Sequence, residues 1–410
     1  MIPFPRKFVP LLALASLVVI LFFSHSLNFR DTWRDLPQSV GLGEVITPST
    51  KITHDDTPKE SSANSKSPQP AFHPGTPKSA GNYSRILVVP RMSSEDTTWI
   101  KEELPDLDTA IYVADDPSAP LHPPKNKGHE VMIYLTYIID HYEELPDIMI
   151  FMHAHRYSWH NNDILNNDAV EMISRLSSQR VTREGYMNMR CHWDPGCPDW
   201  MHPGRTQEDI NKQEETMLAK AWSELFPLDP IPTVLAQPCC AQFALSRERI
   251  QTVPKGRYIY YRDWLLRTPL SDYISGRVWE YIWQYVFTGE STHCPVMHMC
   301  YCDGFGVCFE NEDQFKSWFQ LRFNLRQTEG ELLEWQAKAR RLEEAKEMGR
   351  LDEASLFEVP ETGKDVVLAG RVATMKEELY KQKDMALERG NDPRNRAEAC
   401  GREWKEGDGF

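Results

Sequence analysis

The 410-residue chain has no concentrated run of lysine and arginine, no internal repeat and little glycine. Its 46 Lys and Arg residues are outnumbered by 60 Asp and Glu residues, which leaves a net charge of −14. Proteins that bind nucleic acid carry a basic patch, so nucleic acid is not expected as a partner. Proline (29) exceeds glycine (21) without a fixed period, which excludes a collagen-like chain. The length favours two or three domains, or one large domain with appendages.

One long uncharged run lies near the N-terminus. Arg6 and Lys7 precede residues 8–29, which contain no Asp, Glu, Lys or Arg. We expect a transmembrane signal anchor over 8–29 behind a short cytoplasmic segment, 1–7, because the positive charges favour an N-in orientation. A cleaved signal peptide has the same beginning. In either case the remainder should face a lumen, as in a single-pass type II protein of the Golgi or another secretory compartment.

The composition changes twice along the rest of the chain. Residues 31–84 are rich in Ser, Thr and Pro and should form a disordered stalk, with a glycosylation sequon at Asn82. Residues 85–310 read as a globular domain. Residues 311–410 form a charged tail, helical or disordered, with helical patterns over 325–350 and 372–388 that favour solvated helices or a partner-binding segment.

The globular domain begins with the pattern of an α/β fold. Short apolar runs at 85–90, 109–113 and 148–152 predict buried strands, and apolar spacing over 130–142 predicts one helical face. Ligands of open α/β sheets bind beyond the carboxyl ends of the strands. His153 and His155 follow the third strand, so they are candidates for metal binding, substrate contact or ordinary hydrogen bonding.

Two further groups of side chains suggest a site. Glu280 follows Trp279 and precedes Trp283 on a predicted helix. Desolvation there would suit a general base, although a helical ion pair also explains a glutamate at this position. Trp193 and Trp200 lie in an irregular loop that could stack on a sugar ring or serve only the structure.

The cysteines favour an oxidised compartment. Cys191 and Cys197 bracket a turn-rich loop that a disulfide could close, whereas the adjacent Cys239 and Cys240 would pair elsewhere. Zinc could use the later set, but a lumen argues for disulfides, so eight cysteines should form four bridges and leave Cys400 over. The later set is Cys294, Cys300, Cys302 and Cys308.

Several blocks resemble a fungal family catalogued as domain of unknown function 3431, over roughly residues 85–310. They are Trp99, Ile111-Tyr112-Val113, Gly128-His129-Glu130, the helix 134–142, the strand ending at His155, and segments 243–250 and 280–287. The order of elements is similar to that of nucleotide-sugar glycosyltransferases of the GT-A type. This resemblance implies a mixed sheet flanked by helices, a nucleotide-sugar donor and a glycan acceptor.

The same resemblance implies roles for individual residues. His153-Ala154-His155 stands where such enzymes carry the Asp-x-Asp that holds a divalent metal, and imidazoles favour zinc over Mg²⁺ or Mn²⁺. Glu130 could contact a ribose or sugar hydroxyl, although its place at a helix start also explains it. Without a metal, the leaving diphosphate would need arginines. The candidates are Arg91, Arg247 and Arg249.

Three functional hypotheses therefore stand side by side. The first is a lumenal sugar transferase, with manganese or zinc as possible cofactor. The second is a non-catalytic module that binds glycans or proteins. The third is a His-ligated metal enzyme of fungal secondary metabolism.

Overall fold

The computed structural model describes residues 71–78, 82–207, 209, 212–350, 357–406 and 409. The predicted cytoplasmic segment and anchor, and most of the predicted stalk, lie outside these residues. Within the described part of the chain, no helix is both long and apolar enough to cross a membrane.

The domain is built on a five-stranded mixed sheet of order β2-β1-β3-β5-β4. Strands β1 (Arg85–Arg91), β2 (Asp108–Val113) and β3 (Ile148–Phe151) are parallel neighbours. Strand β5 (Phe243–Ser246) runs antiparallel to β3 and to the edge strand β4 (Tyr186–Asn188). The three predicted strands are confirmed, and the mixed α/β class with them.

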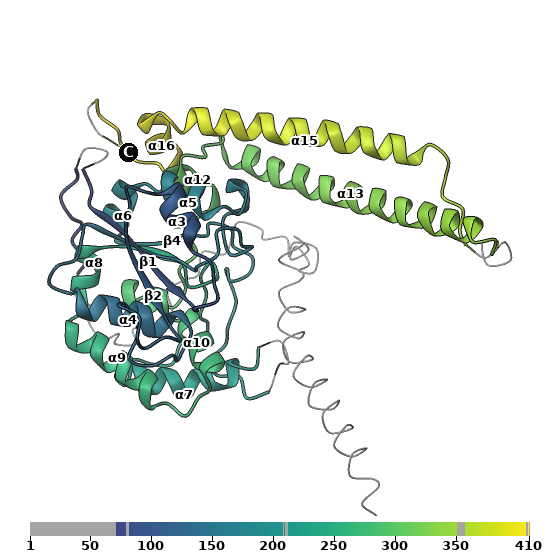
Figure 1. Ribbon diagram of the computed structural model, residues 1–410. Helices are drawn as coiled ribbons and strands as arrows, with labels where there is room; N and C mark the ends of the chain where they lie inside the picture. The colour runs from purple at the N-terminus through teal and green to yellow at the C-terminus, as the bar shows by residue number, and fades with distance from the viewer. Residues whose placement is uncertain are drawn as a thin grey trace, which may run out of the picture.

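Helices cover both faces of the sheet (Figure 1). Alternating side chains of β1 supply both layers: Val88 packs under one set of helices, and Leu87 and Val89 pack under the other. The first set is α4 (Glu130–Asp140), α7 (Glu215–Leu225), α8 (Arg247–Thr252), α9 (Lys255–Arg267), α10 (Asp272–Glu280) and α11 (Trp283–Thr288). The second is α3 (Thr98–Glu103), α5 (Ala169–Arg175), α6 (Ser178–Glu184) and α12 (Met297–Phe305), with the short 3-10 helix η2 (Asp163–Leu165).

The C-terminal tail contains the two expected helices, and both are longer than predicted. They are α13 (Glu312–Glu347) and α15 (Lys364–Arg389), which pack side by side as a helical arm that projects from the domain (Figure 1). The base of the arm is fixed by an ion pair between Arg322 and Asp163. The chain then returns to the domain through α16 (Pro393–Ala399), and Arg402 pairs with Asp303 at 2.7 Å.

Eight cysteines form four disulfides and Cys400 is free, as expected. Two expected pairings are wrong. Cys191 and Cys197 do not bridge each other, because each faces the segment before or within α12; the pairs are Cys191–Cys300 and Cys197–Cys294. The adjacent Cys239 and Cys240 pair with each other in a tight turn in which Cys240 adopts a φ of 100°. The fourth bridge is Cys302–Cys308.

Candidate active site

Charged and imidazole side chains gather where the parallel strands end. Glu280 influences the pKa of both Glu130 and His129, so these three lie within electrostatic reach of one another. His129 in turn acts on His153, and Arg277 acts on His160. We call these six residues the polar cluster: His129, Glu130, His153, His160, Arg277 and Glu280. The structure therefore brings together three residues predicted separately, at positions 130, 153 and 280.

Glu280 takes part in a buried ion-pair network. Nη1 of Arg277 lies 2.7 Å from Oε2 of Glu280, and Nε of Arg277 lies 3.1 Å from Oε1 of Glu214. The hydroxyl of Tyr281 also donates to Glu214. Burial opposes the charge of Arg277, but the two carboxylates hold its pKa well above the ordinary value. Arg277 is therefore a permanent cation that binds and orients Glu280.

Glu130 is the carboxyl group whose titration is shifted into the neutral range. It is partly buried at the first position of α4, and desolvation raises its pKa to about 7. The negative charge of Glu280 adds to this increase, whereas His129 and Arg277 oppose it. A carboxyl group with a pKa near the working pH can both take up and release a proton.

The turn before Glu130 has a demanding backbone. Gly128 and His129 adopt φ angles of 73° and 51°. The carboxylate of Asp272 accepts hydrogen bonds from both backbone N–H groups, at 2.6 and 3.3 Å, and faces the His129 ring. Its hydrogen bond raises the pKa of His129. A Cβ on Gly276 would lie 3.1 Å from Cγ of His129, so α10 packs closely against this turn.

The two inner histidines are held neutral. The rings of His153 and His160 meet edge to face with centroids 4.9 Å apart. Burial lowers the pKa of His153 to about 4 and that of His160 well below its ordinary value. His155 instead points to Glu95 and is largely exposed. No group of three or more metal-ligating side chains occurs among the residues described, so a metal at His153 and His155 stays a prediction.

Two buried glutamines frame the polar cluster on either side of the Cys239–Cys240 pair. Gln237 donates to the backbone oxygen of Glu280 at 2.7 Å, and Oε1 of Gln242 accepts from the backbone N–H of His153 at 3.1 Å. Both side chains are 1% exposed. Sequence reasoning missed them, together with Arg277, Glu214 and Asp272. An arginine three residues before Glu280 was the one available signal, since that spacing favours a helical ion pair.

The other predicted contact residues are distributed around the domain. Trp200 packs against Tyr281 at 4.6 Å, beside the ion-pair network, whereas Nε1 of Trp193 donates to Pro295 at 2.7 Å. Arg91 is the last residue of β1, so it lies at the carboxyl ends of the parallel strands, as the polar cluster does. Arg247 and Arg249 follow β5, whose last residue Ser246 pairs with Ile148, the first residue of β3. They therefore lie at the amino ends of the parallel strands, opposite to the polar cluster. Asn82, which precedes β1, is exposed.

The family model for a protein of unknown function, DUF3431, matches residues 87–303. The chain belongs to this family. The match covers more than half of the sequence and includes every residue of the polar cluster. No curated protein and no solved structure matches the chain.

Proposed function

We propose that this DUF3431 protein transfers a sugar from a nucleotide-sugar donor, with the polar cluster as its catalytic site and a GT-A-like fold around it. One observation carries the proposal: two carboxyl groups share the site in opposite environments, Glu280 bound to Arg277 and Glu130 with a pKa near 7. Acid–base pairs of this kind serve chemistry at sugar hydroxyls and acetals. The location beyond the carboxyl ends of parallel strands also supports a ligand site.

In this proposal Glu130 is the general base, rather than Glu280. The ionised carboxylate of Glu130 takes the proton of an acceptor hydroxyl as the acceptor oxygen bonds to the anomeric carbon. The bond from that carbon to the nucleotide diphosphate breaks, and the diphosphate leaves with the electron pair. Glu280, fixed by Arg277, orients the acceptor. Trp200 offers an aromatic face beside them.

Positive charge for the leaving diphosphate comes from residues at the same carboxyl ends of the strands. Asp272 favours the protonated form of His129, and Arg91 ends the neighbouring strand. Arg247 and Arg249 have no part in this mechanism because they lie at the amino ends of the parallel strands, opposite to the polar cluster. Membrane anchoring and a secretory location remain part of the proposal; the exposure of Asn82 and the four disulfides are compatible with them.

The test is a thermal-shift screen of nucleotide sugars on the full-length protein, with and without Mn²⁺ or Zn²⁺, followed by transfer assays. A ligand at 100 times its dissociation constant adds about 2.7 kcal/mol of stability, which is readily measured. We expect Glu130→Gln to keep donor binding and to lower transfer by roughly 10²- to 10⁴-fold. The matched control is Glu144→Gln, an exposed glutamate after the same helix.

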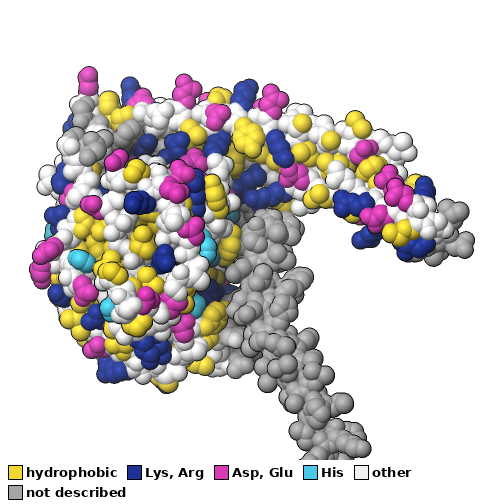
Figure 2. Space-filling view, viewed as in Figure 1, with side chains coloured by type: hydrophobic (Ala, Val, Ile, Leu, Met, Phe, Trp, Pro, Cys, Tyr) yellow, Lys and Arg dark blue, Asp and Glu magenta, His cyan; other side chains and the backbone are white. Residues whose placement is uncertain are grey.

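A second candidate function is partner binding without catalysis. The helical arm exposes Leu333, Val366 and Val367, and Figure 2 shows hydrophobic side chains on its projecting surface. If no nucleotide sugar shifts the melting temperature, the transferase proposal fails and this candidate leads. A shift with zinc alone would instead favour the His-ligated metal enzyme.

A further inference from the structure

A system of two adjoining cavities lies at the amino ends of the parallel strands, away from the polar cluster. Arg85 begins β1 and pairs with Ile148, which begins β3, whereas the polar cluster lies beyond the other end of these strands. One cavity of this system has a volume of about 340 Å³ and is lined by Arg85, Arg175 and Arg396. None of the described residues lining it is acidic. Three elements, β1, α5 and α16, each supply one arginine.

Among the described residues, Glu171 and Asp303 act on Arg175 and Arg396 and also contact other cations. Glu171 lies 3.4 Å from Arg175 and also contacts Lys383 at 3.9 Å. Asp303 acts electrostatically on Arg396 and forms ion pairs with three other arginines. They are Arg180, Arg183 and Arg402, at 3.0, 2.7 and 2.7 Å. The basic lining of this cavity contrasts with the net charge of −14 of the chain.

Two hydrogen-bond donors at the same cavity are left over. Nε of Arg85 is buried without a hydrogen-bond partner among the described residues, while its Nη2 donates to Ile173 at 2.6 Å. Nε2 of Gln179 is in the same state, and Gln179 is 8% exposed. Burial of an unpaired donor costs free energy, so these groups are suited to an acceptor that enters the cavity.

We infer that this cavity binds a tetrahedral oxyanion, carried by a phosphate or sulfate monoester, between Arg85, Arg175, Arg396 and the amide of Gln179. Guanidinium groups present paired donors that match such oxyanions. Burial lowers the pKa of Arg396 to about 10, and the neighbouring Arg175 and Arg402 contribute to this decrease. An anion would relieve this repulsion and tie α16 to the domain.

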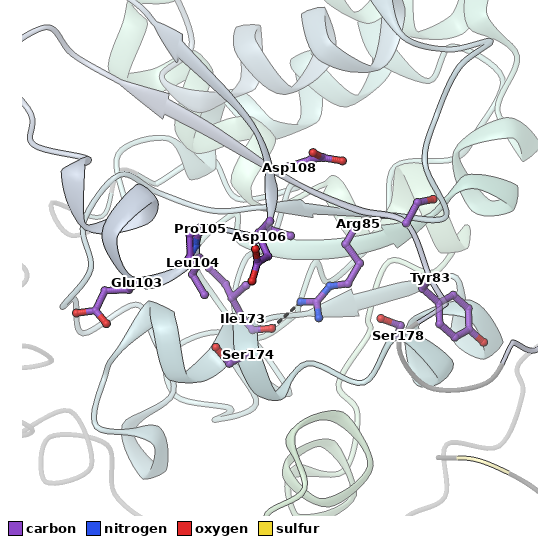
Figure 3. Close-up of a pocket in the computed structure, with 12 residues that line it drawn as sticks. Tyr83, Arg85, Glu103, Leu104, Pro105, Asp106, Asp108, Ile173, Ser174 and Ser178 are labelled. Atoms are coloured by element: carbon purple, nitrogen blue, oxygen red, sulfur yellow. Dashed lines mark hydrogen bonds between the residues drawn. The ribbon is translucent and has the colours of Figure 1, made fainter.

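The adjoining cavity indicates where the organic part of the ester would lie. It shares Tyr83, Arg85, Ser174 and Ser178 with the basic cavity and has a volume of about 520 Å³. In Figure 3 Arg85 reaches toward Ile173, Asp106 comes from the segment before β2, and Asp108 is the first residue of β2. With Glu103, this second cavity is acidic, so it favours hydroxyl or amino groups on the ester.

The test uses the full-length protein and two simple probes, inorganic phosphate and inorganic sulfate. Each is titrated against the melting temperature at constant ionic strength maintained with chloride. We expect saturable stabilisation and an affinity about tenfold weaker in Arg175→Ala, since charge-assisted hydrogen bonds of this kind carry more than one decade in affinity. The matched control is Arg371→Ala, an exposed arginine on α15, which should bind as the wild type does.

Further measurements distinguish a phosphate ester from a sulfate ester, and a second variant replaces the first if that one does not fold. A hexose 6-phosphate and a hexose 6-sulfate show which ester binds more tightly. Should Arg175→Ala fail to fold, Arg85→Lys keeps the charge, loses the paired donors and should weaken binding. If phosphate and sulfate act no differently from chloride, or equally on wild type and both variants, the inference is overturned. Neither result tests the polar cluster, which lies at the carboxyl ends of the strands.

Discussion

Nε2 of His129 lies 3.3 Å from Oδ2 of Asp272, and Oδ1 of the same carboxylate accepts the backbone N–H groups of Gly128 and His129. One side chain of α10 thus holds both the ring and the backbone turn that precedes Glu130. Because the turn needs positive φ angles at two consecutive residues, its geometry depends on this contact.

Asp272→Asn should lower the pKa of His129. The hydrogen bond that the His129 ring donates to Asp272 raises that pKa in the folded protein, so its contribution to stability is complete at low pH and is lost as the pH rises through the folded value. The variant should therefore lose more stability at pH 5 than at pH 8. Histidine NMR titration with denaturant unfolding measures both effects. Asp263→Asn, on the exposed face of α9, is the control, and an unchanged His129 titration would contradict the prediction.

Glu130→Gln should change how stability depends on pH. A carboxyl group with a pKa raised from 4.5 to about 7 binds its proton more tightly when folded, so wild-type stability falls as the pH rises through that interval. The amide does not titrate. Relative to wild type, the variant should gain up to about 3 kcal/mol between pH 4 and pH 8, because a tenfold change in proton affinity corresponds to about 1.4 kcal/mol. Urea unfolding at both pH values decides it; parallel pH curves would refute it.

The sequence sufficed for the three parallel strands, for the helix after residue 130 and for the two helices of the tail, but not for β4, β5 or the site. Ile148–Phe151 is buried on both faces of the sheet. Such a strand can be predicted from sequence because burial on both faces requires a continuous apolar run. The polar cluster instead depends on which distant segments pack together. Asp272 meets Gly128 and Gln237 meets Glu280 across 144 and 43 positions, and no local period encodes such contacts. Arg247 and Arg249 were wrongly assigned to the site for the same reason. Because β5 is antiparallel to β3, these arginines lie at the amino ends of the parallel strands.

Removal of the Cys197–Cys294 bridge should destabilise the domain by about 2–5 kcal/mol, because a native disulfide restricts the unfolded chain. The double variant Cys197→Ala/Cys294→Ala should melt at a lower temperature under non-reducing conditions. Cys400→Ala is the control, as that cysteine is free. A thiol count in denaturant should give one thiol per wild-type chain. A count of three or more would contradict the four bridges.

The ion pair at the base of the helical arm should be the most sensitive point of its docking. Arg322 and Asp163 have side chains 9% and 14% exposed, and Tyr301 donates to the same carboxylate at 2.9 Å. Burial alone would raise the pKa of Asp163, but Arg322 holds it well below the ordinary value. The stability that this carboxylate contributes is therefore complete above about pH 4 and is lost as the pH falls further.

Arg322→Ala leaves Asp163 buried without its cation, and removal of one partner from such a pair costs about 3–5 kcal/mol. We expect that loss at pH 7 and a smaller one at pH 3, measured by denaturant unfolding. Lys376→Ala removes an exposed ion pair with Glu329 on the same arm and should cost less than about 1 kcal/mol. Equal effects of the two variants would mean that the arm is held mainly by its apolar contacts, such as Trp318 and Leu325 in the second core layer, rather than by the buried charge.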